Sequence, residues 1–84
     1  MTEMVLLSTS ACSLCEQALD LLLSMPELRG RTLSVRDVAQ DDALMSAFGA
    51  RVPVLCIGQA ILDWPFERAD VLALVRLVES RPPP

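Results

Sequence analysis

The sequence predicts an α/β fold with the element order βαβαββα, in which helices flank a mixed four-stranded sheet. Three observations lead to it: short apolar runs alternate with amphipathic helical segments, a tight turn separates the last two apolar runs, and 52% of the residues are apolar. The chain of 84 residues suits a single domain, which we place at residues 1–80, followed by a disordered proline-rich tail at 81–84.

The first strand and the first helix follow from the apolar pattern near the N-terminus. Met4–Leu7 is an apolar run that ends in a polar loop, as a buried strand does. The next apolar residues share one helical face: Leu14, Ala18, Leu21, Leu22 and Met25. We expect this helix to begin at Ala11 or Cys12, with Ser10 as its cap, and to end at Pro26.

A second strand and a short helix are predicted in the middle of the chain. Residues 32–38 alternate in polarity and include β-branched side chains, which indicates a half-buried strand. Asp41 and Asp42 supply a cap and a favourable charge for a helix that runs through Phe48 and closes at Gly49. The apolar anchors expected for this helix are Leu44, Met45 and Phe48.

The C-terminal half predicts a β-hairpin and a last helix. Val54–Ile57 is a continuous apolar run, typical of a central strand, and Pro53 belongs at its first position because proline cannot donate to a ladder. A turn at Gly58-Gln59 joins it to an antiparallel strand at Ala60–Leu62. The last helix has one apolar face, formed by Val71, Leu74, Val75 and Val78.

Composition and charge exclude several classes of function. The net charge is −4 and the seven cationic residues, all arginines, are scattered along the chain, so no nucleic-acid partner is expected. No apolar run approaches the roughly 20 residues that span a bilayer. The N-terminus lacks the pattern of a signal peptide. We therefore expect a cytoplasmic protein without membrane contact, and a monomer.

Cys12 and Cys15 carry the chemistry that the sequence predicts. Two cysteines at this spacing can form a small disulfide when they occupy the first turn of a helix. The pair follows a predicted strand and opens an amphipathic helix, which is the context of a redox Cys-x-x-Cys. Because backbone N–H groups at a helix N-terminus favour an anion, Cys12 is the expected nucleophile and Cys15 the expected resolving thiol.

Other interpretations of the cysteines remain open. A structural zinc ion normally takes four Cys or His ligands, whereas this chain has three cysteines and no histidine, so no metal is expected. The pair could also be two inert thiols, or Cys12 could hold an iron–sulfur cluster between two chains. Cys56 falls within the predicted central strand and is expected to be a small buried hydrophobe.

Taken together, these residues resemble a known family. The order of elements, the Cys-Ser-Leu-Cys motif at residues 12–15 and the Val52-Pro53 step before the third strand are similar to glutaredoxins and small glutaredoxin-like bacterial domains of the thioredoxin superfamily. The resemblance covers residues 4–79 and implies a thioredoxin-like fold. It also implies a cis peptide bond before Pro53, which would face the cysteine pair.

The resemblance further implies where a substrate binds. The backbone of Val52 would pair with a substrate peptide or with glutathione, like an added strand. Arg51 is a candidate for binding a glutathione carboxylate, and is equally a candidate for a solvated surface residue. No bound cofactor is expected. The expected partner is a disulfide-containing protein or glutathione acting as cosubstrate.

The chain departs from glutaredoxins in three places. Residues 9–11 include no basic side chain, whereas glutaredoxins commonly have one shortly before the first cysteine. Between the cysteines, Ser-Leu replaces the Pro-Tyr usual in glutaredoxins and the Gly-Pro of thioredoxins. The region that holds the glutamyl end of glutathione reads Leu62–Phe66 here. Within it, Asp63 either caps the approach to the last helix or binds a ligand amine. Trp64 and Phe66 form either a hydrophobic plug under that helix or an apolar rim for a partner protein.

Two functions are consistent with these features. The first is a thiol–disulfide oxidoreductase or electron carrier, in which Cys12 attacks a disulfide and Cys15 resolves the product. The alternative is a non-catalytic thioredoxin-fold module that binds a partner or senses redox state, using the Val52-Pro53 edge together with Trp64 and Phe66.

Overall fold

The computed structural model of the protein describes residues 3–79. Its strands and α-helices follow in the order β1 (Met4–Ser8), α1 (Ser13–Leu23), β2 (Leu33–Asp37), α2 (Asp42–Phe48), β3 (Val54–Ile57), β4 (Ala60–Asp63) and α3 (Arg68–Glu79). Two short 3₁₀ helices are η1 (Pro26–Leu28) and η2 (Val38–Gln40). The predicted order βαβαββα is confirmed, and the tail expected at 81–84 lies outside the described residues. None of the helices in this described part is long and apolar enough to cross a bilayer.

The four strands form one mixed sheet in the order β2-β1-β3-β4. β1 runs parallel to β2 and antiparallel to β3. β3 and β4 form the expected hairpin, whose turn residue Gly58 has a φ of +61° that suits a residue without a Cβ. Leu7 is opposite Val54 in the β1–β3 ladder. The loop after β1 and the loop before β3 therefore emerge at the same end of the sheet.

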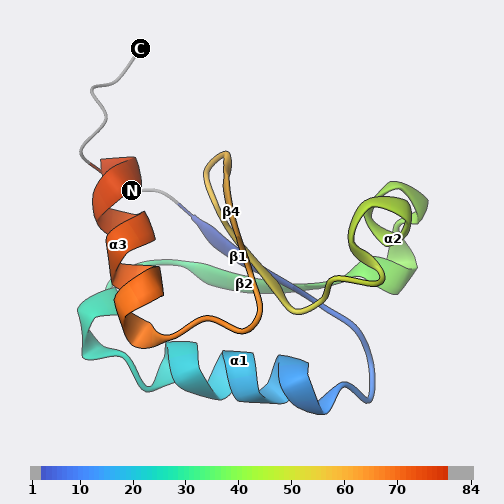
Figure 1. Ribbon diagram of the computed structural model, residues 1–84, viewed down its shortest axis with the longest axis horizontal. Helices are drawn as coiled ribbons and strands as arrows, with labels where there is room; N and C mark the ends of the chain where they lie inside the picture. The colour runs from blue at the N-terminus through green and yellow to red at the C-terminus, as the bar shows by residue number, and fades with distance from the viewer. Residues whose placement is uncertain (1–2, 80–84) are drawn as a thin grey trace.

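One face of the sheet packs against α1 and α3, and Figure 1 shows α1 running along beneath the strands. Side chains alternate between faces along a strand, so Met4 and Leu6 of β1 share this face with their cross-strand partners Ile57 and Leu55 of β3. The core on this side combines buried residues of strands, helices and connections: Met4, Leu6, Ala18, Leu22, Met25, Leu28, Leu55, Ile57, Phe66, Val71 and Val75. Burial of this continuous apolar set holds both helices on the sheet.

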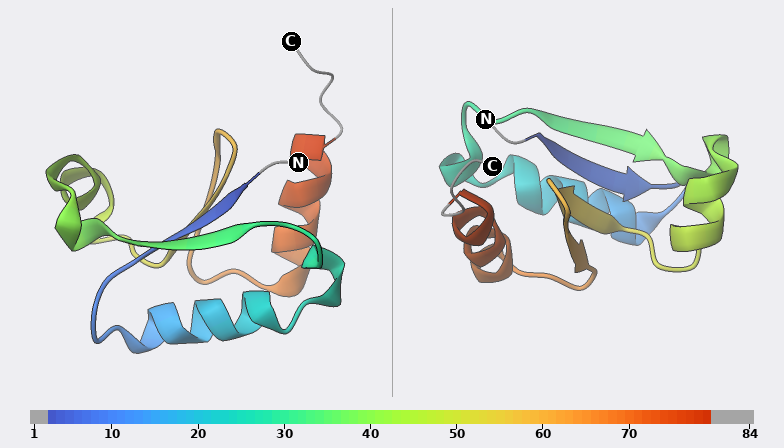
Figure 2. Two further views of the ribbon diagram at one scale, coloured as in Figure 1. Left: turned by 180° about the vertical axis from the view of Figure 1, so that it is seen from behind. Right: turned by 90° about the horizontal axis from the view of Figure 1, so that it is seen from above.

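On the opposite face, η2 and α2 pack against the end of the sheet near Leu7 and Val54. Leu7 and Val54 point to this face, while Leu44 and Phe48 of α2 pack against them. Val38, predicted as the last residue of the second strand, instead begins η2 and is fully buried in this cluster. α2 and α3 stand at opposite ends of the sheet (Figures 1 and 2).

The structure corrects the predicted phase of two helices. α1 buries Cys15, Ala18 and Leu22. Leu14, predicted on the buried face, is 45% exposed, because it lies about 100° around the helix from Cys15 and only one of the two can face the sheet. In α2, Met45 is 50% exposed rather than an anchor, since Leu44 and Phe48, four residues apart, form the inward row.

The helix caps follow the expectation in one case and differ from it in the other. α2 begins as predicted, with the Asp41 carboxylate accepting a hydrogen bond from the backbone N–H of Ala43. α1 is capped by Cys12 itself, whose sulfur accepts from the backbone N–H of Cys15. Ser10 was expected in this role, but it lies in the turn before the cap.

Replacing Leu55 by alanine tests the assignment of the two faces. Leu55 is 0% exposed in the central strand β3, so Leu55→Ala is expected to lower the free energy of unfolding. The loss should be about 2–5 kcal/mol, which is typical of a truncated core leucine. The matched control is Ile61→Ala on edge strand β4, where the side chain is 49% exposed. Urea unfolding followed by circular dichroism measures both, and equal losses would contradict the assignment.

Candidate functional site

Cys12 and Cys15 lie at the start of α1, directly after the loop that follows β1. Cys12 is the N-cap residue, and its sulfur accepts a hydrogen bond from the backbone N–H of Cys15 at 3.2 Å. The Cys15 thiol donates to the Cys12 sulfur, with the two Sγ atoms 2.7 Å apart. Both cysteines are free thiols. The structure therefore holds the predicted pair within reach of a disulfide bond.

The two thiols differ in exposure and ionisation. Cys12 is half-buried, whereas Cys15 is 4% exposed. Burial raises the pKa of the Cys15 thiol, and its hydrogen bond to Cys12 and the charge there raise it further. Hydrogen bonds with the Ser8 side chain and the Thr9 backbone lower this pKa in part. Cys15 is thus a protonated thiol at neutral pH, and Cys12 is the more accessible sulfur.

A strained turn carries the chain from β1 into α1. Ala11 has a φ of +54°, in the left-handed region that residues with a Cβ rarely adopt. It directly precedes Cys12, whose backbone is extended, with φ −110° and ψ 107°. This turn sets the direction in which α1 starts and therefore where the Cys12 thiol is presented.

Ser8 and Thr9 are site residues that the sequence analysis missed. They line a hollow of about 90 Å³ together with Cys12, Cys15 and Glu16. The alternation along β1 was the available signal, because Ser8 lies two residues beyond Leu6 and shares its face.

The Val52–Pro53 peptide bond is cis, as the family resemblance implies. Pro53 is fully buried and Val52 is half-buried. The β1–β3 register brings this step to the same end of the sheet as the loop that leads to the cysteines. The backbone N–H of Trp64 donates to the carbonyl of Pro53 at 3.2 Å, and the Trp64–Pro65 bond is also cis.

Arg51, a candidate for binding a glutathione carboxylate, and Asp63, a candidate for binding a ligand amine, pair with each other. Nη2 of Arg51 lies 2.8 and 3.0 Å from the two carboxylate oxygens of Asp63. The Arg51 guanidinium also lies 5.0 Å from the centre of the Phe48 ring. Asp63 ends β4 and does not cap the last helix; the Asp70 carboxylate accepts from the backbone N–H of Glu67 there.

Trp64 and Phe66 take up different positions. Phe66 is 3% exposed and belongs to the core beneath α3, whereas Trp64 is half-buried. Their rings meet edge to face, with centroids 5.0 Å apart and planes at 82°. They line an open groove of about 540 Å³ together with Gln17, Leu21, Glu67, Arg68 and Ala69. Phe66 therefore acts as the plug, while Trp64 also forms a wall of this groove.

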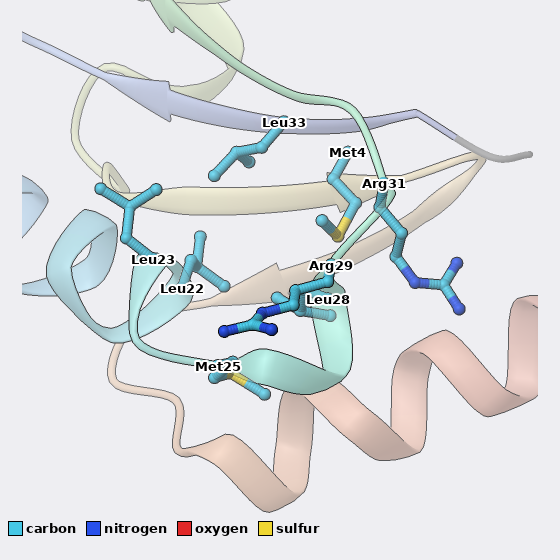
Figure 3. A pocket seen from close by; sticks show the side chains of 8 residues that line it. All are labelled: Met4, Leu22, Leu23, Met25, Leu28, Arg29, Arg31 and Leu33. Atoms are coloured by element: carbon cyan, nitrogen blue, oxygen red, sulfur yellow. The ribbon is translucent and has the colours of Figure 1, made fainter.

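A separate apolar hollow of about 150 Å³ lies at the C-terminal end of α1 (Figure 3). It is lined by Met4, Leu22, Leu23, Met25, Leu28, Arg29, Arg31 and Leu33. Arg31 also forms an ion pair with Glu79 at 2.6 Å. Because the cysteines lie at the opposite end of α1, this hollow is not part of the candidate site.

Cys56 differs from the other two cysteines. It is half-buried and packs beside the cluster beneath α2. Burial raises the pKa of its thiol, Asp63 adds to this and the charge of Arg51 opposes it. Among residues 3–79, no group of three or more Cys, Asp or Glu side chains is placed to hold a metal ion.

Comparison with protein families matches residues 3–76 to the glutaredoxin-like domain (DUF836). The matched residues include β1, the cysteine pair, the Val52–Pro53 step and most of α3. Comparison with curated proteins finds no match.

Solved structures share the fold. The X-ray structure of target protein XcR50 from X. campestris is 32% identical, with a TM-score of 0.72 over 94% of this chain and 99% of that one. A glutaredoxin from Archaeoglobus fulgidus is 20% identical, with a TM-score of 0.60 over 90% of this chain and 88% of that one. A thioredoxin from Thermus thermophilus, also 20% identical, has a TM-score of 0.63 over 94% and 74%. The last two show a thioredoxin-like fold.

Replacing Ala11 by glycine tests the strained turn. The left-handed conformation costs a residue with a Cβ about 1–2 kcal/mol, and glycine's greater entropy in the unfolded chain offsets about 0.5–1 kcal/mol of the relief. Ala11→Gly is therefore expected to raise the free energy of unfolding by about 0.5–1 kcal/mol. Ala73→Gly, at an exposed position inside α3, should lower it by about 1 kcal/mol. Urea unfolding checks both signs, and a loss at Ala11 would contradict the strain.

Proposed function

Because the chain belongs to the glutaredoxin-like domain family (DUF836), we propose that it is a thiol–disulfide oxidoreductase in which Cys12 attacks a disulfide and Cys15 resolves the product. The arrangement of the two sulfurs carries this proposal. They lie 2.7 Å apart, with Cys12 at the helix N-cap and Cys15 buried behind it. An accessible first thiol and a sheltered second one suit sequential exchange.

The proposed reaction has two exchange steps. The Cys12 thiolate forms a bond to one substrate sulfur and breaks the substrate disulfide, and the other sulfur leaves as a thiolate that takes a proton from water. Cys15 then loses its proton to solvent and attacks the Cys12 sulfur, which forms the Cys12–Cys15 disulfide and releases the second substrate thiol. The substrate gains two electrons and the protein loses two. An external dithiol or glutathione returns the pair to its reduced state.

We propose that the substrate lies along the loop that contains the cis Val52–Pro53 bond. That loop and the Cys12 loop leave the same end of the sheet, which supports pairing of a substrate backbone with Val52. Glutathione is a proposed cosubstrate. Its carboxylate would compete with Asp63 for Arg51, because these two side chains are already paired in the free protein.

A second candidate function is a binding module whose thiols are inert. The groove beside Trp64 and Leu21 favours it, because a half-buried tryptophan suits an interface anchor. The two candidates differ in one measurable property, since only an oxidoreductase forms a covalent intermediate with its substrate.

Single cysteine variants test the proposed exchange. In an insulin reduction assay with dithiothreitol, Cys12→Ser is expected to abolish the acceleration, because no other thiol reaches the substrate disulfide first. Cys15→Ser should accumulate a mixed disulfide at Cys12, detected by mass spectrometry. Cys56→Ser is the control and should retain wild-type activity. Wild-type protein that neither reduces insulin nor forms a mixed disulfide would favour the binding module.

The Arg51–Asp63 pair provides a test of glutathione as cosubstrate. Asp63→Asn releases the guanidinium, so the reaction of reduced protein with oxidised glutathione should accelerate about two- to fivefold, as an exposed ion pair of about 0.4–1 kcal/mol allows. The uncharged bis(2-hydroxyethyl) disulfide should show no change. Asp20→Asn removes the same charge from an exposed position on α1 and is the control for general electrostatics. An equal acceleration in both variants would exclude a specific role for the pair.

A further inference from the structure

Ser8 occupies the position on β1 that faces the first turn of α1. Met4, Leu6 and Ser8 lie on one face of β1, and α1 runs back antiparallel to the strand on that face, beneath the sheet in Figure 1. The buried stripe of α1 runs Cys15, Ala18, Leu22. Leu22 packs with Met4 at one end of this contact, and the hollow that contains Ser8 and Cys15 lies at the other end. The inner face of β1 thus ends in a hydroxyl beside the Cys15 thiol instead of a third apolar side chain.

The surroundings of Cys15 disfavour the charge that the resolving step requires. Cys15 is 4% exposed, and burial is the main cause of the raised pKa of its thiol. The hollow is lined further by Leu6, Leu19 and Val35. An apolar wall of this kind supplies no donor to a thiolate.

No cation among the lining residues offsets this cost. Besides Cys15, the titratable groups that line the hollow are Cys12 and Glu16, and neither supplies a positive charge. Asp37, the partner of Ser8 across the β1–β2 ladder, uses a carboxylate oxygen to accept from the backbone N–H of Ala39. A buried thiolate in this hollow can therefore be stabilised only by neutral hydrogen-bond donors at the end of β1.

Two such donors stand beside the sulfur. The Ser8 side chain and the Thr9 backbone line the same hollow as Cys15, and both lower the pKa of its thiol, which favours the charged form. The Ser8 hydroxyl otherwise makes a long hydrogen bond of 3.4 Å to the Thr9 carbonyl, so it can turn toward a thiolate at little cost.

We propose that Ser8 is a catalytic residue of the resolving step, whose hydroxyl, together with the Thr9 backbone, stabilises the Cys15 thiolate as it attacks the Cys12 sulfur. This inference rests on the proposed oxidoreductase function. The Ser8 proton stays on the hydroxyl: Cys15 loses its own proton to solvent, the Cys12–Cys15 bond forms, and the bond from Cys12 to the substrate sulfur breaks. The hydroxyl donates a hydrogen bond to the charged sulfur and takes no part in the attack of Cys12 on the substrate.

The reaction with 5,5′-dithiobis(2-nitrobenzoate), followed by stopped-flow absorbance, separates the two steps. Attack by Cys12 releases the first coloured thiolate, and resolution by Cys15 releases the second. A Cys56→Ser background removes the third thiol. When Cys15→Ser is added to this background, only the first release should be observed. In the Cys56→Ser background, Ser8→Ala should slow the second release about tenfold at neutral pH and move its pH profile to higher pH, because losing one donor lowers the thiolate fraction. The first release should be unchanged.

Further variants separate a hydrogen bond from a packing effect. Ser8→Thr keeps a hydroxyl and should restore the second release, while Ser8→Gly removes it without adding a methyl and should behave like Ser8→Ala. Ser10→Ala, at an exposed position in the same loop, is the matched control and should match the background protein.

Each outcome bears on a different claim. If the background protein shows no first release, the proposed oxidoreductase function fails. If both releases occur and Ser8→Ala leaves the second unchanged across pH, the inference about Ser8 fails while the function stands. Equal slowing of both releases, or no recovery in Ser8→Thr, would also overturn it, since the effect would then be structural.

Discussion

The packing of α1 on the inner face of β1 is the contact on which the candidate site depends. Met4 and Leu6 pack with Ala18 and Leu22, and these side chains are at most 2% exposed. A well-packed helix cannot rotate without losing these contacts, so its first turn has a fixed position over the end of β1. The same contact that stabilises the fold thus decides that Cys15 faces inward. It also leaves Cys12, at the cap, on the accessible side.

Periodicity predicts an element better than it predicts which residues that element buries. The apolar run of β3 and the turn at Gly58 identify the central strand and the hairpin from local signals alone. Local signals do not determine which face of α1 is buried, because a face that includes Leu14 and a face that includes Cys15 are similarly apolar. The choice between them is made by the strand beneath the helix, where burying Cys15 aligns Ala18 and Leu22 with the sheet. The local sequence of the helix does not reveal this tertiary contact.

Some features of the candidate site can likewise be predicted from local sequence signals, whereas others depend on tertiary contacts. The cysteine pair could be predicted because its spacing and its strand–helix context are local, and Pro53 because a family resemblance marks it. The Arg51–Asp63 ion pair could not, since the two residues are twelve positions apart and meet only once β3 and β4 are in register. Taken one at a time from the sequence, each side chain is a candidate for a ligand, Arg51 for a carboxylate and Asp63 for an amine. Because the two side chains pair with each other, a ligand carboxylate would compete with Asp63 for Arg51, and a ligand amine would compete with Arg51 for Asp63.

One turn of helix gives the two thiols opposite environments. Cys12 and Cys15 are three residues apart, close enough for their sulfurs to touch, yet one is accessible and the other is 4% exposed. In the proposed exchange this difference sets the order of the two steps, because a substrate disulfide would reach Cys12 first. It also creates an electrostatic problem, since the second thiol must ionise where water has little access. A third apolar side chain at the end of β1 would pack the helix more tightly, but it would leave that thiolate with one donor fewer. In the proposed resolving step, Ser8 at this position gives up apolar packing and supplies a hydrogen bond to the reacting sulfur.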